Sequence, residues 1–277
     1  MDVDTLLLSG GGMNCIALLG VFKYLFDNRK IDRHFKGIHT IICVSGSIIH
    51  ILPLLLGLSI EATLQLFLGY DKKIIDYDEF DLNKLFIHYG LYKNDLIQTM
   101  IELVLEKKGY SKNMTFKELF TITKIDFIVK VVNISQCKIV YMNHKTHPDF
   151  PISLAARMAT CIPFLFQPIK YNKDYYIDGG LCGNLPLDYI YKKKKYKKYL
   201  GINILVNPKG KIESLQDYLF SIFVIPFSPY DHTTDKHKKI ITININGIGI
   251  DLNITKEMKI KKYMEGIQQT EDYFIHD

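Results

Sequence analysis

The chain has 277 residues, 48% of them hydrophobic, which is enough for one large core, so residues 1–277 are predicted to form a single domain. Its five cysteines are dispersed and lack C-x-x-C spacing, which argues against a disulfide framework or a zinc site and favours a reducing compartment. The net charge of +6 comes largely from residues 192–198 (KKKKYKK); we favour a solvated helix end over docking on anionic lipid or nucleic acid, because no nucleic-acid motif accompanies the run.

Neither of the two most apolar N-terminal stretches has the character of a targeting segment. The stretch MDVDTLLLSGGG is acidic where a signal peptide would be basic, so no secretion signal is expected. Residues 41–58 reach the length of a marginal membrane span, but Ser45, Ser47, His50 and Pro53 interrupt them, and we interpret them as buried core. The prediction is an intracellular, cytoplasmic protein without a transmembrane segment, in peripheral contact with membranes at most.

A glycine loop follows the first predicted strand. Residues 3–8 form an apolar run that leads into Gly10, Gly11 and Gly12, and residues 15–26 then have a helical pattern. Glycines at a helix start let several backbone N–H groups turn toward one anion. The loop lacks the lysine and spacing of a P-loop and the last glycine of a dinucleotide-binding loop, so an oxyanion hole and a simple turn stay as alternatives.

A serine stands at the second predicted junction of strand and helix. The β-branched run of residues 38–44 stops at Ser45, and a buried helix is predicted to follow. A nucleophile elbow places its serine on such a turn, usually within G-x-S-x-G. Here Cys43 and Ser47 replace both flanking glycines, and close packing of strand and helix is the more common reason for small residues at such a junction.

The remaining pattern alternates helices with strands. Helices are predicted at residues 61–68, 82–86, 93–107, 115–120, 152–159 and 255–274, and strands at 127–133, 137–142, 199–206 and 240–245, with a loop at 71–81. Asp178 ends an apolar run and precedes two glycines, which is typical of a carboxylate on a tight turn at a strand edge, although a plain turn former fits as well. Asp188 is interpreted as a helix cap, and Asn94 with Asp95 as a cap before residues 96–105.

Four blocks in this order resemble the patatin-like phospholipase family, and the resemblance extends over nearly the whole chain. They are SGGGMNCIALLGV, ICVSGSI, ARMATCIPFLFQPI and YIDGGLCGNLPLD, followed by a strand and closing helix at the C-terminus. The resemblance implies a three-layer α/β/α fold with a central, mostly parallel sheet. The resemblance is also compatible with a viral member of the family.

The resemblance further implies a lipid acyl hydrolase with a serine–aspartate dyad. Ser45 would attack the ester carbonyl and Asp178 would accept its proton, with an acyl-enzyme between the two half-reactions. The oxyanion hole would use backbone N–H groups of the glycine loop: Gly10, Gly11, Gly12 and Met13. The implied substrate is a phospholipid or another acyl lipid. No cofactor, catalytic metal or nucleic-acid partner is implied.

Two departures from the family pattern keep a second interpretation open. Asn14 and Cys15 stand where the family usually has a cation and a glycine, which weakens the positive field beside the oxyanion. Cys43 and Ser47 would each cost about 1 kcal/mol of strain if their φ were positive. An inactive lipid-binding pseudoenzyme of the same fold is therefore the alternative.

Two further features leave alternatives. His232 or His237 would complete a serine–aspartate–histidine triad, but both lie in a polar stretch typical of solvated surface. Residues 218–230 (YLFSIFVIPFSPY) equally fit an acyl channel, a bilayer contact and a core helix.

Overall fold

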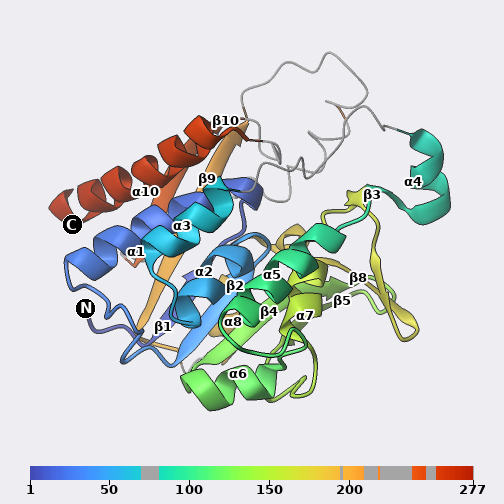
Figure 1. Cartoon of the computed structure of the whole chain (residues 1–277), viewed down its shortest axis with the longest axis horizontal. Helices are drawn as coiled ribbons and strands as arrows, with labels where there is room; N and C mark the ends of the chain where they lie inside the picture. Colours follow the sequence, from blue (N-terminus) through green and yellow to red (C-terminus); the bar gives the residue numbers. More distant parts are fainter. Residues whose placement is uncertain (70–80, 194–195, 209–217, 219–238, 248–253, 277) are drawn as a thin grey trace.

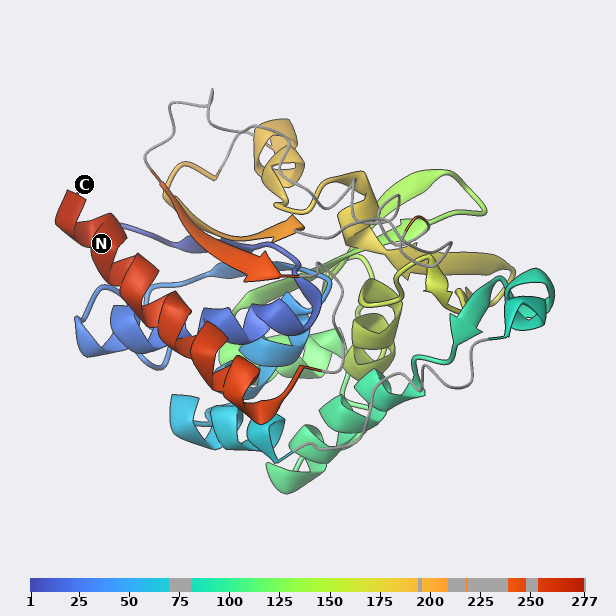
Figure 2. The same cartoon turned by 90° about the horizontal axis from the view of Figure 1, so that it is seen from above.

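The computed structural model describes residues 1–69, 81–193, 196–208, 218, 239–247 and 254–276, which Figure 1 draws in colour. They form an α/β fold in which helices lie on both sides of a mixed, mostly parallel sheet, as predicted (Figures 1 and 2). The sheet order is β10-β9-β1-β2-β4-β8-β7, with β5 paired to β4. Five neighbouring strands from β10 to β4 run parallel, and β5, β7 and β8 add antiparallel pairs beside β4.

The strands and helices have the following bounds. The strands of the main sheet are β1 (Thr5–Leu8), β2 (Thr40–Val44), β4 (Asp126–Asn133), β5 (Lys138–Met142), β7 (Ile169–Tyr171), β8 (Asp174–Asp178), β9 (Tyr199–Pro208) and β10 (Ile240–Gly247). A separate pair consists of β3 (Gly90–Tyr92) and β6 (Phe164–Phe166). The helices are α1 (Ala17–Asp27), α2 (Ser47–Leu55), α3 (Ile60–Leu68), α4 (Leu82–His88), α5 (Asp95–Lys107), α6 (Phe116–Thr123), α7 (Ile152–Ala159), α8 (Leu187–Lys193) and α10 (Lys256–His276), with 3-10 helices η1 (Gly12–Ile16) and η3 (Gly179–Cys182).

Alternating side chains divide the core between the two faces of the sheet. On β1, Leu6 and Leu8 join the large cluster beneath most of the helices, whereas Leu7 joins a smaller cluster with Tyr189 and Ile190 of α8. This period of two is what a strand buried on both faces requires. Both faces are largely apolar, so the buried Lys130 on β4 stands out as a charged side chain within the sheet.

The parallel register places the ends of β1 and β2 at one edge. Leu8 pairs with Cys43, so the glycine loop and the turn at Ser45 leave the sheet side by side. Open parallel sheets bind ligands at the carboxyl ends of their strands for this reason. The fold therefore juxtaposes the two motifs that the sequence separates.

Several local predictions need correction. The helix expected from residue 15 begins as η1, and α1 starts at Ala17. The short strands β3, β6 and β7 were not predicted, because three residues carry too little periodicity. Asn94 stands at the start of α5 but its side chain does not cap that helix; it donates to Thr160 Oγ1 at 2.9 Å. The predicted loop at 71–81 lies outside the described residues except for its last residue.

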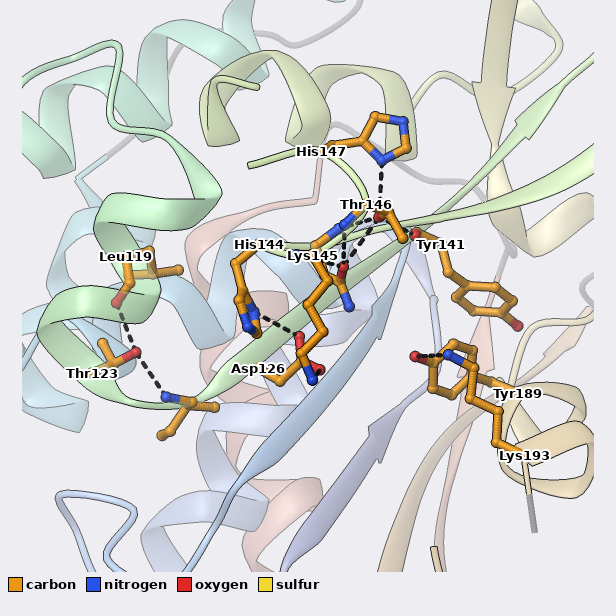
Figure 3. A network of polar contacts seen from close by, with 12 residues as sticks. Leu119, Thr123, Asp126, Tyr141, His144, Lys145, Thr146, His147, Tyr189 and Lys193 are labelled. Carbon is orange, nitrogen blue, oxygen red and sulfur yellow. Dashed lines mark hydrogen bonds and ion pairs between the residues drawn. The ribbon is translucent and has the colours of Figure 1, made fainter. Parts of the chain in front are cut away.

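A polar cluster occupies the opposite, N-terminal end of β4 (Figure 3). His144 Nδ1 lies 3.1 Å from a carboxylate oxygen of Asp126, and its ring stacks on Phe120 with centroids 3.7 Å apart. Asn143 accepts two backbone N–H bonds from the same turn. These contacts fix the turn after β5, and they place His144 at the end of β4 away from Asp178, which is paired with Val131.

Helices α1 and α10 cross with backbone contact at two glycines. A Cβ on Gly266 would lie 2.1 Å from the Ala17 carbonyl oxygen, and one on Gly20 would lie 2.0 Å from that of Tyr263.

Helix propensity alone would make the Gly266→Ala variant about 1 kcal/mol more stable than the wild type, because alanine favours a helix more than glycine does. We expect the opposite, a loss of about 1–3 kcal/mol, because the added methyl forces the helices apart. Urea unfolding measures the change in stability, and Lys261→Ala on the exposed face of α10 serves as control. A higher urea midpoint for Gly266→Ala than for the wild type would contradict the close contact between α1 and α10.

Candidate active site

Ser45 occupies a strained turn between a buried strand and a buried helix. Strand β2 ends at Val44, α2 begins at Ser47, and Ser45 between them has φ of 54°, a left-handed conformation that side chains rarely adopt. The side chain of Ser47 holds this turn, because its hydroxyl donates to the Val44 carbonyl at 2.7 Å and accepts from the Val44 N–H at 3.0 Å. The backbone thus turns sharply from strand to helix at Ser45, which is the arrangement that a nucleophile elbow requires.

The two replaced elbow glycines cause no backbone strain. Cys43 lies within β2 and Ser47 within α2, and neither has a positive φ. The glycine that the turn needs is Gly46, where an added Cβ would lie 2.4 Å from the Gly12 carbonyl oxygen. The positive φ, and the backbone strain that accompanies it, therefore occur at Ser45 and not at Cys43 or Ser47.

Asp178 meets Ser45 at the end of the antiparallel strand β8. The Ser45 hydroxyl donates to Asp178 Oδ2 at 2.5 Å, and the N–H of Gly180 donates to Oδ1 at 2.8 Å. The backbone N–H of Asp178 donates to the Cys161 carbonyl at 2.9 Å. Both side chains are buried, at 3% exposure for Ser45 and 0% for Asp178. The serine and the carboxylate thus form one buried hydrogen-bonded pair.

Burial sets the proton affinity of Asp178. It raises the pKa of this carboxyl to about 7, against the opposing effects of the Ser45 and Gly180 hydrogen bonds and of the Lys130 cation. The carboxylate is thereby a much stronger base than an exposed aspartate. Such a value suits proton transfer near neutral pH.

The glycine loop lies directly against Ser45. A Cβ on Gly10 would lie 2.7 Å from the Cβ of Ser45, so only glycine fits at this position. Gly12 has φ of 56° and begins η1. The first N–H groups of a helix have no intrahelical partner, and they give its start a positive potential.

Asn184 fixes this loop, although no local pattern in the sequence marks it as a site residue. Its amide donates to the Gly10 carbonyl at 3.1 Å, and its carbonyl accepts from the Gly10 N–H at 3.0 Å. The only signal in the sequence is its place in the block after Asp178. The two reciprocal bonds join the segment after the aspartate to the glycine loop.

Lys130 is the second residue that the sequence analysis missed. It lies on β4 with 0% exposure, and its ammonium donates to the carbonyls of Cys182 and Gly183, both at 2.8 Å. It also contacts Asp188 at 3.3 Å, and burial lowers the pKa of Lys130. A buried cation thus holds the turn between Asp178 and Asn184.

Asp188 does not have the predicted role of a helix cap. It lies in the first turn of α8, and its carboxylate accepts from the Tyr141 hydroxyl at 2.7 Å and from Lys130. It is therefore the counter-charge of the buried lysine.

The histidine nearest to Ser45 in the sequence is buried behind the turn. His50 Nδ1 contacts the Gly46 carbonyl at 2.9 Å, and burial lowers the pKa of His50 to about 4. Among the described residues, the side-chain partner of Asp178 is Ser45. His232 and His237 lie outside the described residues, as do residues 219–230 of the candidate acyl-channel segment.

Within the described ranges, no three side chains of the metal-binding types converge as a metal site would require. Nor does any described helix combine the length and apolar character needed to cross a membrane.

Comparisons with known proteins identify relatives of this chain. The sequence model of the family described as "Patatin-like phospholipase" matches residues 6–191. The "Probable lipid hydrolase 463L" of Invertebrate iridescent virus 6 is 36% identical over 242 residues, which cover 87% of this chain and 76% of the relative. The uncharacterized protein R571 of Acanthamoeba polyphaga mimivirus is 32% identical, with 67% of this chain and 61% of that protein covered.

Solved structures share the fold at low sequence identity. VipD from Legionella pneumophila superposes with a TM-score of 0.69 at 13% identity, covering 100% of this chain and 67% of VipD. ExoU from Pseudomonas aeruginosa, in its complex with SpcU, gives a TM-score of 0.53 at 15% identity, covering 99% of this chain and 52% of that one. Because the family model covers residues 6–191 and the viral relative is 36% identical over most of the sequence, the chain belongs to the patatin-like phospholipase family.

Proposed function

We propose that this protein cleaves carboxylic ester bonds of phospholipids with a dyad of Ser45 and Asp178. The observation that carries the proposal is the 2.5 Å hydrogen bond from the Ser45 hydroxyl to the buried Asp178 carboxylate. A nucleophile and its base need this distance for proton transfer. The φ of 54° at Ser45 adds support, because strained backbone of this kind is concentrated at functional sites.

The reaction proceeds in two half-reactions. As Ser45 Oγ bonds to the ester carbonyl carbon, its proton passes to Asp178 Oδ2. The carbon–oxygen bond to the glycerol then breaks, and the proton moves to the departing alcohol, which leaves as a lysophospholipid. Water attacks the acyl-enzyme with Asp178 as base, and the proton returns to Ser45 as the fatty acid leaves.

The glycine loop would stabilise the negative oxygen formed in each step. Gly11, Gly12 and Met13 are the donors we assign, since they lie at the start of η1 beside Ser45. Gly10, grouped with them in the sequence analysis, has its N–H bonded to Asn184 and is assigned to holding the loop. One oxyanion donor is worth about 3 kcal/mol in transition-state stabilisation.

Covalent labelling of the wild-type protein tests this function. A fluorophosphonate probe should phosphonylate Ser45, as peptide mapping would show, and vesicles of labelled phosphatidylcholine should release fatty acid at a rate that the probe abolishes. A lipid panel then gives the preference for head group and acyl position. If the protein binds vesicles but takes no label and releases no fatty acid, it is the inactive lipid-binding alternative, for which the replacement of the family's cation by Asn14 is the motivating observation.

A further inference from the structure

A group of large apolar side chains is exposed at one end of the molecule. Phe86 and Ile87 at the C-terminal end of α4 are 77% and 67% exposed, Tyr89 just after it is 60% exposed, and Phe164 on β6 is 50% exposed. We call Phe86, Ile87, Tyr89 and Phe164 the α4 surface. In both views α4 projects from the body on the side to which the parallel strands point (Figures 1 and 2). Apolar groups gathered in this way mark an interaction site.

The α4 surface is held by specific contacts with the body. Helix α4 ends at His88, Tyr89 is its C-terminal cap, and the next residue, Gly90, is paired with Phe164. A Cβ on Gly90 would lie 2.3 Å from the backbone of β6, so the two strands are in close contact. The Tyr89 ring meets the Tyr175 ring of β8 edge-on, with centroids 6.3 Å apart. The α4 surface is therefore anchored at Tyr89 and Phe164.

The same two strands connect the α4 surface with the candidate active site. Strand β8 runs from Asp174 to Asp178, so Tyr175 and the catalytic carboxylate are on one short strand. Phe164 follows closely after Cys161, whose carbonyl accepts the N–H of Asp178. A lipid layer in contact with the α4 surface would thus lie beside the dyad.

Basic side chains border the α4 surface, and the acidic groups described beside it, Asp81 and Asp174, keep their charge but accept hydrogen bonds within the protein. Lys170 lies over the Tyr175 ring, 5.6 Å from its centroid, and Lys93 and Lys173 are exposed. Asp174 accepts from Asn133 and Gln136. Asp81 accepts from the N–H of Asn83 at the start of α4. An apolar centre with a cationic rim complements an anionic lipid surface.

We infer that the α4 surface docks on anionic phospholipid bilayers, with Phe86 and Ile87 inserted among the lipids and Lys93 and Lys170 against their head groups. The inference rests on the proposed hydrolysis of phospholipids and adds the contact through which substrate is reached. A second copy of the chain fits less well, because a symmetric contact would bring the two lysine rims together.

Vesicle co-sedimentation tests the inference. The double variant Phe86→Glu/Ile87→Glu changes two exposed side chains and leaves the core intact. It should bind vesicles of phosphatidylcholine with phosphatidylglycerol at least about tenfold more weakly than the wild type. Its activity on these vesicles should fall in the same proportion, while hydrolysis of monomeric p-nitrophenyl butyrate stays unchanged. The control is Met264→Glu/Ile275→Glu on α10, a helix away from α4, where the two side chains are 53% and 66% exposed.

The lysine rim is tested separately. Wild-type binding should weaken when phosphatidylglycerol is omitted, and Lys93→Glu/Lys170→Glu should remove that difference. Unchanged vesicle binding by the α4 double variant, an equal loss in the α10 control, or equal binding to both vesicle types would overturn the inference. The inference would also be overturned if the wild type were a dimer and Phe86→Glu/Ile87→Glu dissociated it without any loss of vesicle binding. A protein that binds vesicles through the α4 surface but hydrolyses neither substrate would refute the proposed function and leave the surface in place.

Discussion

Asp178→Asn is expected to abolish measurable phospholipid hydrolysis and to make the folded protein more stable above pH 7. Asparagine keeps the shape of the side chain but cannot take the Ser45 proton, so kcat should fall by about a thousandfold or more. Ser45→Ala should cause a similar loss, since the two residues act as one unit. Release of fatty acid from labelled vesicles measures both.

The gain in stability follows from the titration of Asp178. Its pKa lies at about 7 in the folded protein, against the ordinary value of 3.8, and burial is the main cause. Because the folded state binds the proton more tightly, stability is full below pH 4 and is lost as pH rises to 7. Holding the buried carboxylate ionised therefore costs on the order of 4 kcal/mol. A neutral amide in its place carries no such cost, so the melting temperatures of wild type and variant should differ at pH 8 and converge near pH 4.

The same titration governs the rate. The wild-type kcat/KM should rise with pH through about 7, because only the ionised Asp178 accepts the Ser45 proton. Beside Asp178, burial raises the pKa of Cys161 to about 12 and that of Cys15 still further, so both thiols stay neutral. Among the described residues, the cation of Lys130 lowers the pKa of Asp178.

Asp174→Asn on the same strand is the matched control for Asp178→Asn, since Asp174 is bonded to Asn133 and Gln136 rather than to Ser45. It should keep full activity and an unchanged pH profile. Retained hydrolysis in Asp178→Asn, or a melting temperature below that of the wild type at pH 8, would contradict the assigned role and environment of Asp178.

The sequence predicts the frame of this site because its signals are local. Strand β2, the turn at Ser45 and helix α2 follow from one apolar run interrupted by small residues, and α7 has the predicted bounds of 152–159. Period and composition suffice for such elements, because each buries a face that its own pattern defines. The dyad itself was proposed by family resemblance, since nothing local joins residue 45 to residue 178.

Contacts between distant residues could not be predicted. Lys130 is one charged position in the apolar run DFIVKVVN, and its carbonyl partners lie at Cys182 and Gly183, far along the chain. The pairing of Asn184 with Gly10 likewise spans most of the chain. Both depend on the sheet order, which puts β8 beside β4 and β1 beside β2. Single-sequence patterns carry no information about such pairings without the topology.

Lys130→Met is expected to lower kcat/KM by about ten- to a hundredfold, with most of the loss in kcat. Methionine fits the buried volume but leaves the Cys182 and Gly183 carbonyls without their donor. The turn that carries Asn184 then loses its support, and with it the loop from Gly10 onward loses the fixed position that oxyanion stabilisation requires.

The pH profile separates this role from general loosening of the fold. The Lys130 cation lowers the pKa of Asp178, against the effect of burial, so its removal should move the rate midpoint to higher pH. In this chain, Asn14 and Cys15 replace the family's usual cation and glycine. Among the residues that the structure describes, Lys130 is the cation that affects the pKa of Asp178. Lys138→Met on the exposed start of β5 is the control and should leave rate and midpoint unchanged. A slower Lys130→Met enzyme whose midpoint stays in place, or moves to lower pH, would show that the lysine supports the fold without acting on the base.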